Sequence, residues 1–207
     1  AKYAEKSGLK TISFHVPADE DGKAIYAGLA KSVENFAQTV VEGGLLSLHH
    51  FDDYKQPTKE KISRIKQIFL LANVKSQVVS IRSAVSRGQK LASAVTASRD
   101  LISQPSNTAT PSYLADKARE FAKSFGMTCK VLTTNDMKRL GMGALLGVTK
   151  GSEEPPAFII LEHHGGDKDD PPIVIIGKGI TFDTGGISLK PPPSMDEMKM
   201  DMSGGSI

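Results

Sequence analysis

The sequence predicts a mixed α/β protein built from two units. Three observations support this: an alternating, strand-like stretch near the start, several short apolar runs, and helical periodicity in the segments between them. Helices that alternate with fully apolar strands indicate a sheet with helices on both of its faces. We expect a small α/β unit over residues 1–75, and a linking helix followed by the first part of a larger mixed α/β domain over residues 76–207.

The first unit is expected to contain a strand, a helix and a second strand. Residues 9–16 (LKTISFHV) alternate apolar and polar side chains, which is typical of a strand. Residues 23–46 carry apolar side chains at helical spacing, among them Val33 and Phe36. The segment 62–73 (ISRIKQIFLLAN) contains a further strand. No motif in this unit points to chemistry.

The second unit is expected to begin with two helices. A long helical pattern covers residues 75–102. The next helix has clear signals at both ends: Thr110 can cap it, Pro111 suits its first position, and Gly126 suits its end. We therefore place this helix between Pro111 and Gly126.

Strands are expected to follow in the second unit. Residues 127–134 predict a strand and residues 135–143 a short helix that ends in glycine. Three apolar runs, at 144–151, 156–164 and 172–177, are interpreted as buried strands, the last as a central one. Ligands of open α/β sheets bind beyond the carboxyl ends of such strands. The loop after residue 177 is therefore where we expect a site.

Charge and cysteine content exclude several classes of protein. The 26 basic and 23 acidic residues leave a formal charge of +3, and no run of lysine and arginine suggests a nucleic-acid-binding arm. Cys129 is the single cysteine, which excludes an internal disulfide and fits a reducing compartment. The apolar runs are too short to cross a bilayer, and no secretory signal opens the chain. We expect a cytoplasmic protein that binds neither membrane nor nucleic acid.

A polar cluster follows the run at 172–177. Lys178, Asp183, Lys190 and Asp201 stand among glycines and prolines. A phosphate-binding loop is excluded because Lys178 is followed by β-prone residues, and because Pro172 occupies the position where that motif needs its first glycine. A metal site fits better, because the two carboxylates can bind a divalent cation and a lysine beside it can polarise a carbonyl.

A plain alternative stands beside the metal site. Lysines and aspartates in a glycine-rich loop are usually solvated, and any one of these four taken alone would carry little weight. The methionines of the segment 195–202 are by default core-filling side chains. Composition and spacing alone therefore predict an α/β protein with a plausible metal-hydrolase site.

The stretch GKGITFDTGGISLKP, followed by MDEMKMDMSGG, closely resembles the leucyl aminopeptidase family, the cytosolic two-metal aminopeptidases. The resemblance extends back through SRDLISQPSNTATPSYLADKA and covers nearly the whole chain. It implies hydrolysis of the first peptide bond of a peptide with a free N-terminus by a water that two metal ions activate, with leucine and other apolar residues preferred. Zinc or manganese is the implied metal, with magnesium as an alternative. A homohexamer is also implied.

The resemblance also implies a role for each residue of the cluster. Lys178 is a metal ligand through its neutral amine, Asp183 bridges two metal ions, and Asp201 binds the more loosely held one. Lys190 is the catalytic lysine that binds the substrate carbonyl oxygen. Met198 lines the pocket for the N-terminal side chain of the substrate.

One part of the family pattern is missing. The family carries an Asp-x-Glu-x-Arg stretch that completes the metal sites, and none follows Asp201. Together with the abrupt ends of the chain, this predicts a piece of a longer protein that is inactive by itself. The alternative is a non-catalytic relative that serves in binding or assembly. Retention of all four polar residues at the family spacing favours the peptidase, because a non-catalytic relative has no physical need for a lysine ligand.

Overall fold

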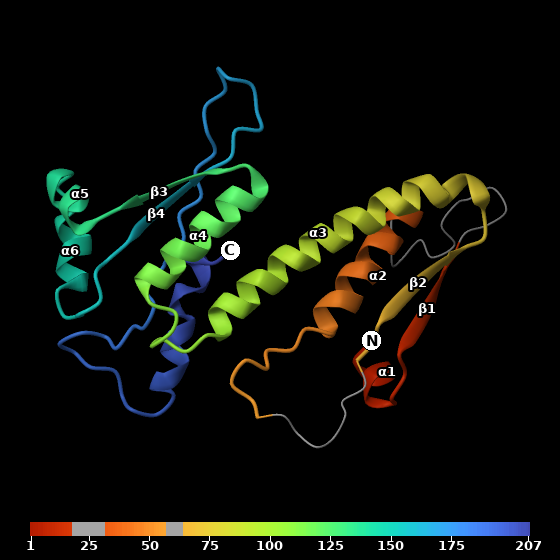
Figure 1. Cartoon of the computed structure of the whole chain (residues 1–207), viewed down its shortest axis with the longest axis horizontal. Coiled ribbons are helices and arrows are strands. Elements are labelled where there is room, and N and C mark those ends of the chain that lie inside the picture. The colour runs from red at the N-terminus through yellow and green to blue at the C-terminus, as the bar shows by residue number, and fades with distance from the viewer. Residues whose placement is uncertain (18–31, 57–63) are drawn as a thin grey trace. The chain divides into compact units, whose positions relative to one another are not determined.

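Figure 1 shows the computed structural model of the chain, which describes residues 1–17, 32–56 and 64–207. The chain divides into two compact units, Ala1–Arg99 and Asp100–Ile207. Helices accompany a sheet of two strands in each unit, so the mixed α/β class is confirmed. The domain division expected at residue 75 stays a prediction.

The first unit is a parallel strand pair with helices. Its elements are α1 (Lys2–Lys6), β1 (Thr11–Val16), α2 (Val33–Ser47), β2 (Gln67–Ala72), η1 (Lys75–Gln77) and most of α3 (Val78–Ser103). β1 and β2 lie side by side, with Thr11 opposite Gln67 and Val16 opposite Ala72 (Figure 1). Both strands expected from the sequence are confirmed.

Helix α2 begins where a capping residue allows it. The Ser32 hydroxyl accepts a hydrogen bond from the backbone N–H of Asn35, which satisfies a donor that the first turn leaves free. Val33, Ala37 and Val41 recur at helical spacing and are buried. The helix expected over 23–46 is confirmed from residue 33 onward, and its start before residue 32 lies outside the described residues.

The core of the first unit contains side chains from both a strand and helices. It consists of five buried side chains: Val16, Val33, Ala37, Ile81 and Ala84. They come from β1, α2 and α3, so the long helix expected after residue 75 is confirmed and contributes its first turns to this core.

No described helix is both long and apolar enough to cross a membrane.

The second unit combines an antiparallel strand pair with several helices. Its elements after α3 are α4 (Pro111–Phe125), β3 (Thr128–Leu132), α5 (Thr134–Arg139), α6 (Gly143–Thr149), β4 (Phe158–Glu162) and η2 (Met195–Gly205). Thr128 of β3 stands opposite Glu162 of β4, and α4 packs against both strands (Figure 1). The strand expected at 127–134, the helix at 135–143 and the strand within 156–164 are confirmed.

Two predicted strands are wrong. The run 144–151 begins within helix α6 (Gly143–Thr149), where Ala144, Leu145 and Leu146 favour helix over strand. Residues 172–177 form no strand, although Ile173 and Ile176 are β-branched. A strand needs a paired backbone, and this run has no strand partner within residues 64–207. Ile173 and Ile176 are accordingly 93% and 90% exposed.

Candidate metal and catalytic centre

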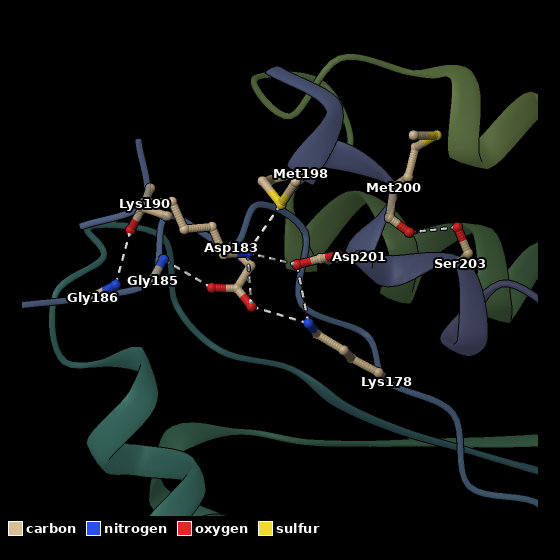
Figure 2. Close-up of polar contacts among 10 residues, drawn as sticks. Lys178, Asp183, Gly185, Gly186, Lys190, Met198, Met200, Asp201 and Ser203 are labelled. Atoms are coloured by element: carbon tan, nitrogen blue, oxygen red, sulfur yellow. Dashed lines mark hydrogen bonds and ion pairs between the residues drawn. The ribbon is translucent and has the colours of Figure 1, made fainter. Parts of the chain in front are cut away.

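Four charged side chains from separate points in the sequence meet in the second unit (Figure 2). The Nζ atom of Lys178 lies 3.0 Å from Asp183 Oδ2 and 3.0 Å from Asp201 Oδ2. The Nζ atom of Lys190 lies 3.6 Å from Asp183 Oδ2 and 3.4 Å from Asp201 Oδ2. Two ammonium groups therefore face two carboxylates, and their formal charges cancel.

A tight turn places Asp183 and Lys190. The backbone N–H of Gly185 donates to Asp183 Oδ1 at 2.9 Å, and the backbone N–H of Lys190 donates to the Thr184 carbonyl at 2.9 Å. Gly185 has a φ of 90°, a backbone conformation that residues other than glycine rarely adopt. The turn thus holds one carboxylate and returns the chain so that Lys190 reaches the same point.

The last two contributors come from η2, which is a 3₁₀ helix of 11 residues. Because such a helix has about three residues per turn, side chains three apart lie on one face. Met198 and Asp201 share the face toward the cluster, and the Lys190 ammonium donates to Met198 Sδ at 3.0 Å. Met202 lies on a second face and is buried, whereas Met200 lies on the third and points away from the cluster (Figure 2).

A backbone-to-backbone contact joins the start of the loop to the end of η2. The N–H of Gly205 donates to the Lys178 carbonyl at 2.7 Å. A Cβ atom at Gly177 would lie 1.9 Å from the Gly204 carbonyl oxygen, a distance that no side chain tolerates. Gly177 is therefore required by space, and Gly185 both by its backbone conformation and by space, because a Cβ there would lie 2.6 Å from the Ser188 carbonyl oxygen.

The electrostatics of the cluster follow from these contacts. Hydrogen bonds from the Lys178 ammonium and then from the Gly185 N–H lower the pKa of Asp183 to about 2. Hydrogen bonds to Asp183 and then to Asp201 raise the pKa of Lys178 above its ordinary value. Without another cation in place, Asp183 is ionised and Lys178 is protonated at neutral pH.

The donor set fits part of a metal site. Two carboxylate oxygens already share one cationic nitrogen, and both aspartate side chains keep about a quarter of their surface exposed, at 27% and 26%, so an ion from solvent can reach them. A neutral Lys178 amine would add a nitrogen donor. Residues 1–17, 32–56 and 64–207 contain no group of three or more His, Cys, Asp and Glu side chains that could hold a metal. Zinc usually takes about four ligands, so these residues supply only part of a complete set.

The structure brings all five residues expected from the sequence into one place. Lys178, Asp183, Lys190 and Asp201 form the charged cluster, and Met198 touches Lys190. Two features were missed. Lys199 donates to the Ser103 carbonyl at the end of α3, and the glycine pair 204–205 packs on the loop at 177–179. No local pattern reveals either contact, because the methionines of MDEMKMDMSGG are spaced by three, two and two residues and do not mark the faces of η2.

The chain is similar to known proteins of one family. Residues 96–207 match the family described as "Cytosol aminopeptidase family, catalytic domain". The "Probable cytosol aminopeptidase" of Alkaliphilus metalliredigens is 40% identical over 84% of this chain and 35% of its own length. The protein of the same description from Nitrosomonas eutropha is 37% identical over 98% of this chain and 42% of its own length. The chain therefore spans well under half the length of these relatives.

A solved structure is similar over nearly the whole chain. "Bottromycin maturation enzyme BotP in complex with Mn" has a TM-score of 0.74 and 32% sequence identity, and the match covers 96% of this chain and 38% of that one. A match of this extent includes residues of both units.

Proposed function

Because the chain belongs to the cytosol aminopeptidase family, we propose that it carries part of the active site of a metal-dependent aminopeptidase. The proposed reaction is hydrolysis of the N-terminal residue from a peptide with a free N-terminus, leucine and other apolar residues being preferred. The observation that carries the proposal is the convergence of Lys178, Asp183, Lys190 and Asp201, whose ammonium and carboxylate groups lie 3.0–3.6 Å apart.

Lys178, Asp183 and Asp201 are the proposed metal ligands. In the structure the Lys178 ammonium donates to both carboxylates that would hold a divalent cation. Ligation therefore requires Lys178 to lose its proton. Asp183 is proposed to contact two ions and Asp201 the more loosely held one. Divalent ions supply Lewis-acid polarisation and lower the pKa of bound water. Zinc or manganese is proposed, with magnesium as an alternative, and the similar solved structure, a complex with Mn, supports manganese.

Lys190 is the proposed catalytic residue. Its ammonium lies 3.6 Å from Asp183 Oδ2 and 3.4 Å from Asp201 Oδ2, farther than the Lys178 ammonium, which lies 3.0 Å from each. A cationic donor in this position can bind the carbonyl oxygen of the scissile bond and stabilise the negative charge that develops there. Met198 places its thioether 3.0 Å from that ammonium, which supports a role for Met198 in lining the pocket of the substrate side chain.

The 207 residues are proposed to be inactive alone. They supply two carboxylates and one amine, and a two-metal site needs more ligands than these. We propose that the remaining ligands belong to a longer protein, as the length of the relatives suggests. A hexameric assembly and a cytosolic location are part of the same proposal, and the native mass of the protein in solution measures the first.

The proposal is tested by replacing Lys190 in the protein as its organism produces it. Hydrolysis of leucine p-nitroanilide is measured after chelator treatment and again after addition of Mn²⁺, Zn²⁺ or Mg²⁺. We expect Lys190→Met to lower kcat by about a hundredfold or more, while Mn²⁺ binding persists because Lys190 is not a proposed ligand. Asp201→Asn should weaken Mn²⁺ binding itself.

The control is Lys168→Met, which alters an exposed lysine of the loop after β4 and should leave both readouts unchanged. Hydrolysis that survives Lys190→Met would contradict the catalytic assignment. Mn²⁺ binding without hydrolysis by the wild-type protein would instead favour the non-catalytic relative.

A further inference from the structure

Lys199 lies two residues before Asp201 in η2, and its hydrogen bond is to a residue outside the charged cluster. Its ammonium donates to the backbone carbonyl of Ser103 at 3.0 Å. Ser103 is the last residue of α3, and the last carbonyls of a helix have no partner within the helix. A lysine there satisfies one such carbonyl and also meets the negative end of the helix dipole. The contact is therefore a favourable tie between η2 and a rigid helix end.

The hydrogen bond from Lys199 holds η2, a helix whose winding depends on contacts from outside it. Runs of 3₁₀ helix longer than about four residues are uncommon because their hydrogen-bond geometry is poorer than that of an α-helix. η2 continues for 11 residues and ends in two glycines. Local preference therefore does not explain why η2 keeps this winding, and contacts from outside must hold it.

The winding determines what faces the cluster. With about three residues per turn, Met198, Asp201 and Gly204 align on one face, where they meet Lys190, Lys178 and Gly177. With about 3.6 residues per turn, each step of three residues falls about 60° short of a full turn, so Gly204 would lie about 120° around the helix from Met198 and the three positions would no longer align. The same 3₁₀ winding puts Lys199 and Met202 together on the buried side.

We propose that Lys199 is a positioning residue for the metal-binding and catalytic cluster. By fixing the rotation of η2 against the end of α3, it keeps the Asp201 carboxylate and the Met198 sulfur turned toward Lys178 and Lys190. The Gly205–Lys178 backbone bond fixes the other end of η2. The inference deepens the proposed function and depends on it for its kinetic consequence, but the orientation of η2 can be measured without it.

The test compares Lys199→Met with Lys199→Arg in the protein as its organism produces it. The methionine keeps the length of the side chain and removes the donor, whereas the arginine retains a donor. Mn²⁺ affinity is read from the electron paramagnetic resonance signal of free Mn²⁺, and backbone amide exchange of residues 195–205 is read by mass spectrometry. Lys168→Met is the matched control.

We expect Lys199→Met to weaken Mn²⁺ affinity by about tenfold, in the range seen when groups that orient a metal ligand are removed. Amide exchange in η2 should accelerate by about tenfold, and kcat should fall more than KM rises. Lys199→Arg should recover most of the loss. Mn²⁺ affinity and η2 exchange equal to wild type in Lys199→Met would overturn the proposal, as would a lower melting temperature with unchanged affinity.

Two further outcomes remain decisive. If Lys199→Met does not fold, Lys199→Ala takes its place, and wild-type Mn²⁺ affinity in that variant, which also lacks the donor, would overturn the proposal. If the wild-type protein binds no Mn²⁺, the proposed function fails, while faster exchange of η2 in Lys199→Met would still support the positioning of η2 by Lys199.

Discussion

Helices α4 and η2 of the second unit are specified in opposite ways. α4 (Pro111–Phe125) is fixed by its own ends: the Thr110 hydroxyl accepts from the Tyr113 N–H, and Gly126 adopts the left-handed conformation with a φ of 66°. η2 (Met195–Gly205) begins at Ser194 without a side-chain cap. Its anchors are far away in the sequence, at Ser103 and Lys178.

The difference shows where this molecule places its chemistry. α4 packs on the strand pair and carries none of the charged cluster, whereas η2 contributes both Asp201 and Met198. A helix defined by its caps tolerates change in its surroundings. A helix defined by distant contacts is oriented by them, so its side chains can be aimed at the same point as those of a separate loop. Variants that perturb only α4 or only η2 therefore test whether each helix is held by its caps or by distant contacts.

The largest effect is expected from Gly177→Ala. Its Cβ would collide with the Gly204 carbonyl and push η2 away from the loop that carries Lys178. We expect the free energy of unfolding to fall by about 3 kcal/mol and Mn²⁺ binding to be lost. Denaturant unfolding and Mn²⁺ titration measure the two effects.

Gly179→Ala is the matched control for this prediction. It lies two residues away, a Cβ there meets nothing within 4 Å, and its φ is not in the left-handed region. Its free energy of unfolding should stay within about 0.5 kcal/mol of wild type. Equal losses in the two variants would show that the contact between Gly177 and Gly204 does not hold η2.

An intermediate loss of stability is expected when the caps of α4 are removed. Thr110→Ala removes the acceptor for the Tyr113 N–H, and Gly126→Ala forces a Cβ into a left-handed residue. Each should lower the free energy of unfolding by about 1 kcal/mol. Because neither residue touches the cluster, Mn²⁺ affinity should not change. A loss of Mn²⁺ affinity equal to that of Gly177→Ala would contradict the division between the two helices.

A smaller, pH-dependent contribution to the stability of the fold is expected from α5, a second helix with a local cap. The Thr133 hydroxyl and then its backbone N–H donate to Asp136 and lower the pKa of that carboxyl below its ordinary value. A carboxyl whose pKa is lower in the folded state stabilises the protein above its unfolded pKa of about 3.9. That stabilisation disappears as the pH falls through the folded value.

The measurement for α5 is the melting temperature of wild type and Asp136→Asn between about pH 7 and pH 2.5. The difference should be largest at neutral pH and should shrink as the pH falls below about 4. Lys138→Gln serves as a control because Lys138 takes no part in the cap. A difference that grows toward low pH would have the wrong sign for this account.

Local signals explain which parts of the structure could be predicted from the sequence. Thr110, Pro111 and Gly126 mark α4 because caps act within a few residues. The cluster residues could be named because their spacing resembles a known family. The run 144–151 was assigned to a strand, although helix α6 covers Gly143–Thr149, because a short apolar run does not distinguish helix from strand.

The remaining errors concern contacts between distant segments. Residues 172–177 have the composition of a strand, but pairing depends on a neighbouring backbone that no local pattern reveals. No local pattern marks Lys199, since its hydrogen bond is to Ser103, 96 positions earlier. The 3₁₀ winding of η2 was equally invisible, because it is maintained by those same distant contacts.

The central claim is that Lys178, Asp183 and Asp201 bind a divalent metal beside Lys190. The most direct test is a crystal structure of the protein as its organism produces it, grown with Mn²⁺ and measured at the manganese absorption edge. We expect an anomalous peak bonded to Asp183, Asp201 and the Lys178 amine, with the Lys190 ammonium near it and not bonded to it. Strong peaks only elsewhere, with Lys178 still paired to both carboxylates, would contradict the account.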